Sequence, residues 1–183
     1  MNYAETILPE FDREIANTRK VLERVPEDKL DWQAHPKSHT IGWNANHLAE
    51  ILGWVAGVLT APAWDIAPIG GEPYQSPKLT SRQEILNLFD RNVAAARKAI
   101  AAVKDDQLTQ PWSLLKAGTP FLTVPRATMM RNFVLNHLIH HRAHHGPKNR
   151  LQRGKTHGLR HLAQAARGGP CGHVHDHGSR NAH

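Results

Sequence analysis

Apolar side chains recur every three or four positions along four stretches of this chain, which is the spacing of amphipathic helices. The four predicted helices cover residues 3–25, 40–59, 81–103 and 125–145. Residues with known preferences for helix ends support these limits. Thr40 is a good N-cap residue, and Pro125 suits the first turn of a helix. Ser81 and Glu84 have the spacing of a capping box.

The segments between these helices carry no convincing strand pair. Residues 61–80 are rich in proline and glycine, which predicts a long irregular loop. Such a loop can be a lid or a pocket wall, or an ordinary surface crossover. Residues 105–123 contain short extended pieces that are compatible with a small hairpin. The predicted fold class is therefore all-α, a four-helix bundle.

The net charge of the 183-residue chain is +7, and its location decides its meaning. Residues 142–183 carry eight Lys and Arg side chains against one acid, Asp176. The basic and acidic residues of positions 1–141 balance, so the predicted bundle is neutral. This division argues against a nucleic-acid-binding core and makes any binding by the basic tail a separate question.

Other totals narrow the class of protein. The length suits one domain with its own core. No apolar run approaches the length of a membrane span, and no signal peptide is recognisable at the start of the chain. The single cysteine, Cys171, excludes an intrachain disulfide framework. These features predict a cytoplasmic protein that does not enter a membrane.

Three histidines carry the candidate chemistry. His137 and His141 lie four residues apart on the fourth predicted helix, so their rings point the same way. His47 lies on the inward stripe of the second helix. Histidines at such positions can also be hydrogen-bonded core groups, but inward side chains of different helices converge in a bundle. We therefore predict a metal site in which zinc is the expected ion, with nickel, cobalt and iron(II) as alternatives.

Two better-known metal sites do not fit the sequence. Carboxylate-bridged di-iron bundles need acids on several helices, and residues 125–145 contain none. The HExxH pattern of zinc peptidases is also absent after His47. Glu50 lies one turn from His47, where it can orient a ligand or act as a base, or serve only as a surface or capping group.

The same residues resemble the DinB/YfiT-like superfamily of four-helix-bundle proteins. The resemblance covers residues 5–143 and is carried by an ordered set of segments. These are residues 25–38 (VPEDKLDWQAHPKS), 41–49 (IGWNANHLA), 108–112 (LTQPW), 122–126 (LTVPR) and 135–142 (LNHLIHHR). The resemblance implies three histidine metal ligands, which match His47, His137 and His141. It also implies a homodimer and a small-molecule substrate. A low-molecular-weight thiol is one candidate for this substrate.

The sequence departs from the family pattern after Arg142. Gly146 and Pro147 are expected to end the helix early, and the rest is rich in Arg, Gly and His. We hypothesise that a reading-frame change near codons 143–145 replaced the usual ending. The predicted organisation is a bundle over residues 1–145 and a disordered basic tail over residues 146–183. The histidine cluster at residues 173–177 is a candidate loose metal site within that tail.

The function that the resemblance implies is a metal-dependent transferase of the low-molecular-weight-thiol S-transferase type, or a hydrolase. Secondary candidates for contact with the ligands or the substrate are His140, Arg142 and Trp43. The first alternative is a non-catalytic metal-binding or stress-response protein in which the histidines serve stability. The second is a nucleic-acid-associated protein that acts through its basic tail.

Overall fold

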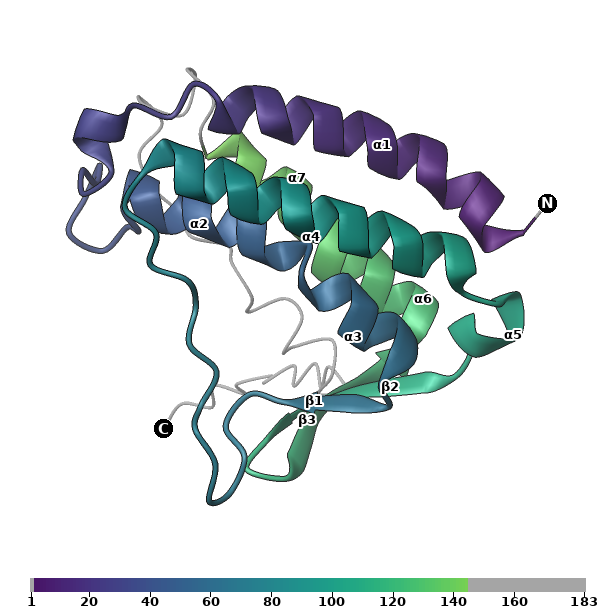
Figure 1. The fold of residues 1–183 in the computed structure, drawn as a ribbon. Coiled ribbons are helices and arrows are strands. Elements are labelled where there is room, and N and C mark those ends of the chain that lie inside the picture. Colours follow the sequence, from purple (N-terminus) through teal and green to yellow (C-terminus); the bar gives the residue numbers. More distant parts are fainter. Residues whose placement is uncertain (1, 145–183) are drawn as a thin grey trace, which may run out of the picture. The chain divides into compact units, whose positions relative to one another are not determined.

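The computed structural model describes residues 2–144, and the four predicted helical stretches are the main elements of this part of the chain. In chain order the elements are α1 (Tyr3–Leu22), a 3-10 turn (Glu27–Lys29), α2 (Ile41–Ile51), α3 (Trp54–Thr60), β1 (Ala63–Asp65), α4 (Arg82–Ala102), α5 (Asp105–Leu108), β2 (Pro111–Lys116), β3 (Thr119–Pro125), α6 (Arg126–Met129), a π-helical segment (Met130–Leu135) and α7 (Asn136–Ala143). Helix α4 packs against α1, α2 and α3, and α7 packs against α1 and α2 (Figure 1).

The helix starts follow the capping residues of the sequence. The Ser81 hydroxyl accepts a hydrogen bond from the Glu84 backbone N–H at 3.2 Å, and the Glu84 carboxylate accepts one from the Ser81 N–H, as the capping box predicts. The Thr40 hydroxyl accepts from the Trp43 N–H at 3.0 Å. Pro125 is the residue before the first turn of α6. Local hydrogen-bonding preferences therefore fix these boundaries.

The second predicted helix is broken into α2 and α3. The Gly53 N–H bonds to the Glu50 carbonyl at 2.8 Å instead of reaching back to Ala49. The Ala49 carbonyl accepts from the Asn92 side chain of α4 at 2.9 Å. A Cβ atom at Gly53 would lie only 3.2 Å from the Asn92 amide nitrogen, so glycine permits this close approach. A side chain from a distant helix thus replaces one hydrogen bond of a continuous helix.

The fourth predicted helix is continuous in direction but not in type. Its middle part, Met130–Leu135, is π-helical and lies between α6 and α7. Such wide turns are rare and occur often at functional sites. This one directly precedes the residue pair His137 and His141, and Phe133 within it contacts the ring of His137.

The prediction of an all-α four-helix bundle is wrong, because the helices are joined by a three-stranded mixed sheet in the order β1-β2-β3. Strands β2 and β3 form an antiparallel hairpin, whereas β1 pairs with β2 in parallel (Figure 1). A parallel pair needs a long crossover, which here contains α4. Strand β1 has only three residues and its partner lies far along the chain, so no local pattern marks it.

The hairpin depends on a tight turn with two residues of positive φ, Ala117 at 51° and Gly118 at 73°. This geometry matches the twist of paired strands. The Asp65 carboxylate at the end of β1 accepts backbone N–H bonds from Ala117 at 3.2 Å and Gly118 at 2.7 Å. The carboxylate also accepts from the Ala67 N–H at 3.0 Å, and this bond, with those from Gly118 and Ala117, holds the pKa of Asp65 below its usual value. The hairpin turn is thus hydrogen-bonded to the end of β1.

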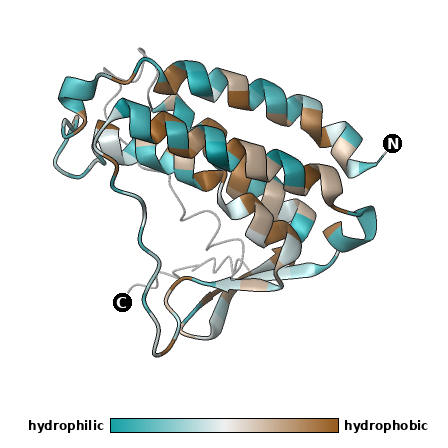
Figure 2. Cartoon of the chain, viewed as in Figure 1, coloured by the Kyte–Doolittle hydropathy of each residue, from teal (hydrophilic) through white to brown (hydrophobic). Residues whose placement is uncertain are grey.

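The apolar stripes of the helices meet in one core. Figure 2 shows apolar and polar residues interleaved around α1 and α4, as amphipathic helices require. The largest fully buried side chains come from both the sheet and the helices. They include Trp112 of β2, Phe11 of α1 and Phe89 of α4. Within residues 2–144, no helix combines the length and apolar character needed to cross a membrane.

Candidate metal centre

The three histidines that the sequence singles out lie together between α2 and α7. The Nε2 atom of His137 is 3.4 Å from Nε2 of His47 and 2.9 Å from Nε2 of His141. One nitrogen from each ring lies within 4.8 Å of the others, a spacing that can hold a metal ion. Within the described part of the chain, no other group of three His, Cys, Asp or Glu residues is gathered in this way.

The opposite nitrogen of each ring has its own acceptor. His47 Nδ1 lies 3.0 Å from the Glu50 carboxylate, and His141 Nδ1 lies 2.8 Å from the Asn44 side-chain oxygen. His137 Nδ1 lies 3.3 Å from the carbonyl of Phe133. An acceptor beside Nδ1 requires the proton there, which leaves the Nε2 lone pair free. Three lone pairs therefore face one another, an arrangement suited to a cation.

Burial keeps two of the rings in the neutral form that binds metals. It lowers the pKa of His137 to about 4, with the neighbouring His47 adding to the effect. It lowers the pKa of His141 to about 2, for the same two reasons. Neutral imidazole is the ligand form, so neither ring needs to lose a proton at neutral pH before it can coordinate.

Aromatic side chains hold the imidazoles in place. Trp43 stacks on His47, with ring centroids 4.7 Å apart, and its own ring is covered by His39 at 3.5 Å. Trp54 of α3 meets His47 at 5.5 Å and His137 at 5.9 Å. These rings cover part of the sides of the cluster, and apolar cover of this kind strengthens electrostatic interactions inside it.

Glu50 connects the cluster to the loop over residues 61–80. Its side chain is 2% exposed, and one carboxylate oxygen accepts hydrogen bonds from the hydroxyls of Tyr74 and Ser76. Burial would raise the pKa of Glu50, but the hydrogen bonds from His47, Tyr74 and Ser76 outweigh it, so the pKa lies below its usual value. Burial and the Glu50 contact raise the pKa of Tyr74 to about 12. Glu50 is therefore an ionised group that orients His47.

The loop is also tied to α2 through its backbone. The Asn46 side chain donates to the Leu79 carbonyl at 2.9 Å and accepts from the Leu79 N–H at 3.0 Å. Of the two interpretations of residues 61–80, the structure favours a wall of the site over a plain crossover. Tyr74 and Ser76 could not be found from the sequence, since an irregular loop has no periodicity. Asn44 offers a signal, because a polar residue on the inward face of a helix needs a partner.

The secondary candidates differ in what they contact. Trp43 lies against the cluster, as described above. His140 is exposed, and its ring meets His144 at 4.8 Å. Arg142 does not reach the cluster centre: it donates to the Glu14 carboxylate at 2.5 Å and to the Thr18 hydroxyl at 3.2 Å, joining α7 to α1. The histidines of residues 173–177 lie outside the described residues.

Comparisons with known proteins agree with this architecture. A solved structure of a DinB-like protein from Bacillus cereus superimposes with a TM-score of 0.58, covering 77% of this chain and 87% of that one at 22% identity. That likeness concerns the fold. No curated protein matches the sequence. The profile of the DinB superfamily matches residues 10–146, which include all three histidines. The chain therefore belongs to the DinB superfamily.

Proposed function

We propose that this protein binds one divalent metal ion through His47, His137 and His141 and acts as a metal-dependent transferase or hydrolase on a small molecule. The observation that carries the proposal is the convergence of three Nε2 atoms whose rings are each anchored at Nδ1. Such outer hydrogen bonds set the tautomer and ring orientation of metal-binding histidines. Three neutral imidazoles suit zinc, with nickel, cobalt and iron(II) as alternatives.

The residues around the three histidines have different roles. Glu50, Asn44 and the Phe133 carbonyl hold the ring protons and keep the three lone pairs directed inward. Trp43 and Trp54 pack against the ring of His47 from two sides. A bound metal ion lowers the pKa of a coordinated water or thiol, which supplies a nucleophile at neutral pH. The thiol-transferase and hydrolase alternatives differ only in which of these two groups attacks.

Metal analysis of the purified full-length chain tests the site. We expect about one equivalent of metal per chain, lost in the His137→Ala and His141→Ala variants. His140→Ala is the matched control, because His140 is exposed on the same helix between the two ligands. An unchanged metal content in the ligand variants would contradict the proposal.

Activity assays then separate an enzyme from a metal-binding protein without catalysis. Transfer of a low-molecular-weight thiol to chlorodinitrobenzene tests the transferase, and cleavage of nitrophenyl acetate tests the hydrolase. We expect one of the two rates to disappear with a chelator and to return when the metal is restored. A bound metal with no effect on either reaction would favour the non-catalytic alternative.

A further inference from the structure

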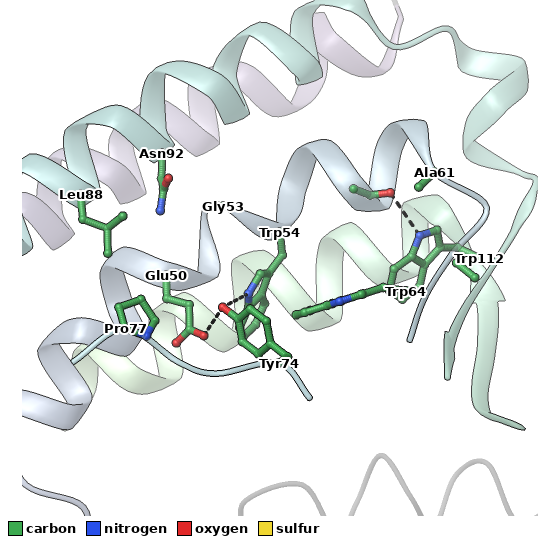
Figure 3. A pocket seen from close by; sticks show the side chains of 12 residues that line it. Glu50, Gly53, Trp54, Ala61, Trp64, Tyr74, Pro77, Leu88, Asn92 and Trp112 are labelled. Atoms are coloured by element: carbon green, nitrogen blue, oxygen red, sulfur yellow. Dashed lines mark hydrogen bonds between the residues drawn. The ribbon is translucent and has the colours of Figure 1, made fainter. Parts of the chain in front are cut away.

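A cavity of about 430 Å³ lies beside the histidine cluster, between α3, α4 and the loop that contains Tyr74. This volume is within the range of roughly 300–1,000 Å³ typical of small-molecule sites. Glu50 and Trp54 line it (Figure 3), and these two residues also contact His47. The cavity and the candidate metal centre therefore share a wall.

The floor of the cavity is formed by small residues at every fourth position of one helix face, Gly53, Gly57 and Ala61. Gly53 is explained by the approach of Asn92, but Gly57 is not explained by packing. A Cβ atom at Gly57 would meet no atom of the described residues within 4 Å, and the φ angle of Gly57 is not positive. Glycine inside a helix costs about 1 kcal/mol relative to alanine. The missing side chain at Gly57 therefore serves to leave this space open.

The walls are aromatic and flat. Trp64 meets Tyr74 edge to face with centroids 4.7 Å apart, and Trp54 lies 5.9 Å from Trp64 (Figure 3). Trp112 closes the far end. Aromatic faces of this kind pack best against other flat rings.

Several polar side chains of the cavity already have partners within the protein. The Trp54 indole N–H donates to the Tyr74 oxygen, which itself donates to Glu50. The Trp112 indole N–H donates to the Gly57 carbonyl at 3.3 Å. Among residues 2–144, no lysine or arginine lines the cavity, and Glu50 disfavours a negative charge there. What is left for a ligand is a mainly apolar surface.

We infer that this cavity binds a flat, uncharged aromatic group, and that this group is the part of the substrate that places the reacting atom at the metal. The claim that the aromatic group places the reacting atom at the metal rests on the proposed function. Binding of the group by the cavity does not depend on a metal. Gly57 is then the residue that determines specificity, because it sets the depth available to the ring.

Ligand-observed fluorine NMR with para-fluorobenzyl alcohol tests the inference on the full-length chain, both as purified and after chelator treatment. We expect saturable binding in both states. Gly57→Leu fills the floor and should weaken binding at least about tenfold, and Gly57→Ala should weaken it about threefold, since single methylenes change affinity measurably in apolar sites. Ala95→Leu is the matched control, because it adds the same side chain to an exposed position of α4 and should leave binding unchanged.

The Gly57 variants should still fold, because replacing a glycine inside a helix should not lower the melting temperature. A measured melting temperature therefore separates loss of binding from loss of the fold. Absence of saturable binding by the wild-type chain, or equal binding by Gly57→Leu and the wild type, would overturn the inference. Displacement of the alcohol by tetramethylammonium at lower concentration would overturn it in favour of a cation site of aromatic walls and a carboxylate. Alcohol binding by a chain that takes up no metal even when zinc is added would contradict the proposed function and leave the cavity as a binding site.

Discussion

Each inward-facing nitrogen of the histidine cluster is held by a hydrogen bond on the other side of its ring. Among these bonds only that of His47 is made to a charged group, the carboxylate of Glu50. A charged acceptor forms a stronger hydrogen bond than a neutral one and makes the ring a better ligand. Glu50 is therefore the outer residue on which metal affinity should depend most.

Replacing Glu50 by glutamine should weaken metal binding by about 10- to 100-fold, because the neutral amide keeps an acceptor but loses the charge. Competition with a chelating dye measures this affinity. Glu72→Gln removes the same charge from an exposed position of the loop and should leave the affinity unchanged. Equal affinities for both variants would show that Glu50 does not support the site.

The same rings predict how the stability of the metal-free protein depends on pH. Burial holds the pKa of His137 at about 4 and that of His141 at about 2. In the unfolded chain a histidine has a pKa of about 6.5, so on acidification the unfolded state takes up protons first. Stability contributed by the neutral rings is therefore complete above about pH 6.5 and is lost as the pH falls toward the folded-state values.

Urea unfolding of the chelator-treated protein at several pH values measures this loss. The free energy of unfolding should fall by at most about 1.4 kcal/mol per pH unit for each such histidine, and solvent screening of these partly buried rings should make the loss smaller. A His137→Gln variant should show a shallower dependence. If the wild-type stability were flat between about pH 6.5 and pH 4, the rings would not be buried in neutral form.

At the scale of elements, one arginine fixes the end of α3. Arg126 is 6% exposed, and its guanidinium donates to the carbonyls of Val58 at 2.5 Å and Ala61 at 2.6 Å. The C-terminal end of a helix presents carbonyls without partners and attracts cations. Arg126 thus joins the start of the last helical segment to the helix that carries Trp54 and Gly57.

Replacing Arg126 by alanine should lower the free energy of unfolding by about 2–4 kcal/mol, because one buried and one partly buried carbonyl lose a charged donor. Chemical denaturation measures the change. Arg97→Ala is the control, since Arg97 forms an exposed ion pair with Asp12 and should lower stability much less. Similar losses in the two variants would contradict the capping role of Arg126.

Elements whose signals are local were predictable, and those made by distant partners were not. The caps at Thr40 and Ser81 and the inward position of His47, His137 and His141 follow from spacing alone. The break before Gly53 depends on Asn92, which lies on another helix. The parallel pairing of β1 depends on residues some 50 positions later. The π-helical segment leaves no mark on the sequence pattern, because apolar residues keep their helical spacing through it.

At the scale of the whole molecule, a metal ion would join two helices from opposite halves of the described chain, α2 and α7. A ligand that binds only the folded state raises stability by about 4 kcal/mol at a thousand times its dissociation constant. We expect zinc to raise the melting temperature of the chelator-treated protein, as measured by calorimetry. His141→Ala should remove the increase, whereas His140→Ala should keep it. An equal increase in both variants would place the binding elsewhere.

The separation of the ligands along the chain also sets the order of events when the protein folds. His47 and His137 are 90 residues apart, so the complete site exists only after a long loop has closed. Since this closure costs chain entropy before the contact can repay it, we expect the site to be completed only after the transition state. We therefore expect zinc to leave the refolding rate nearly unchanged and to slow unfolding, as stopped-flow measurements in urea would record. Zinc would then stabilise the native state only after the chain has folded. A faster refolding rate with zinc would show that the ion instead takes part in assembling the fold.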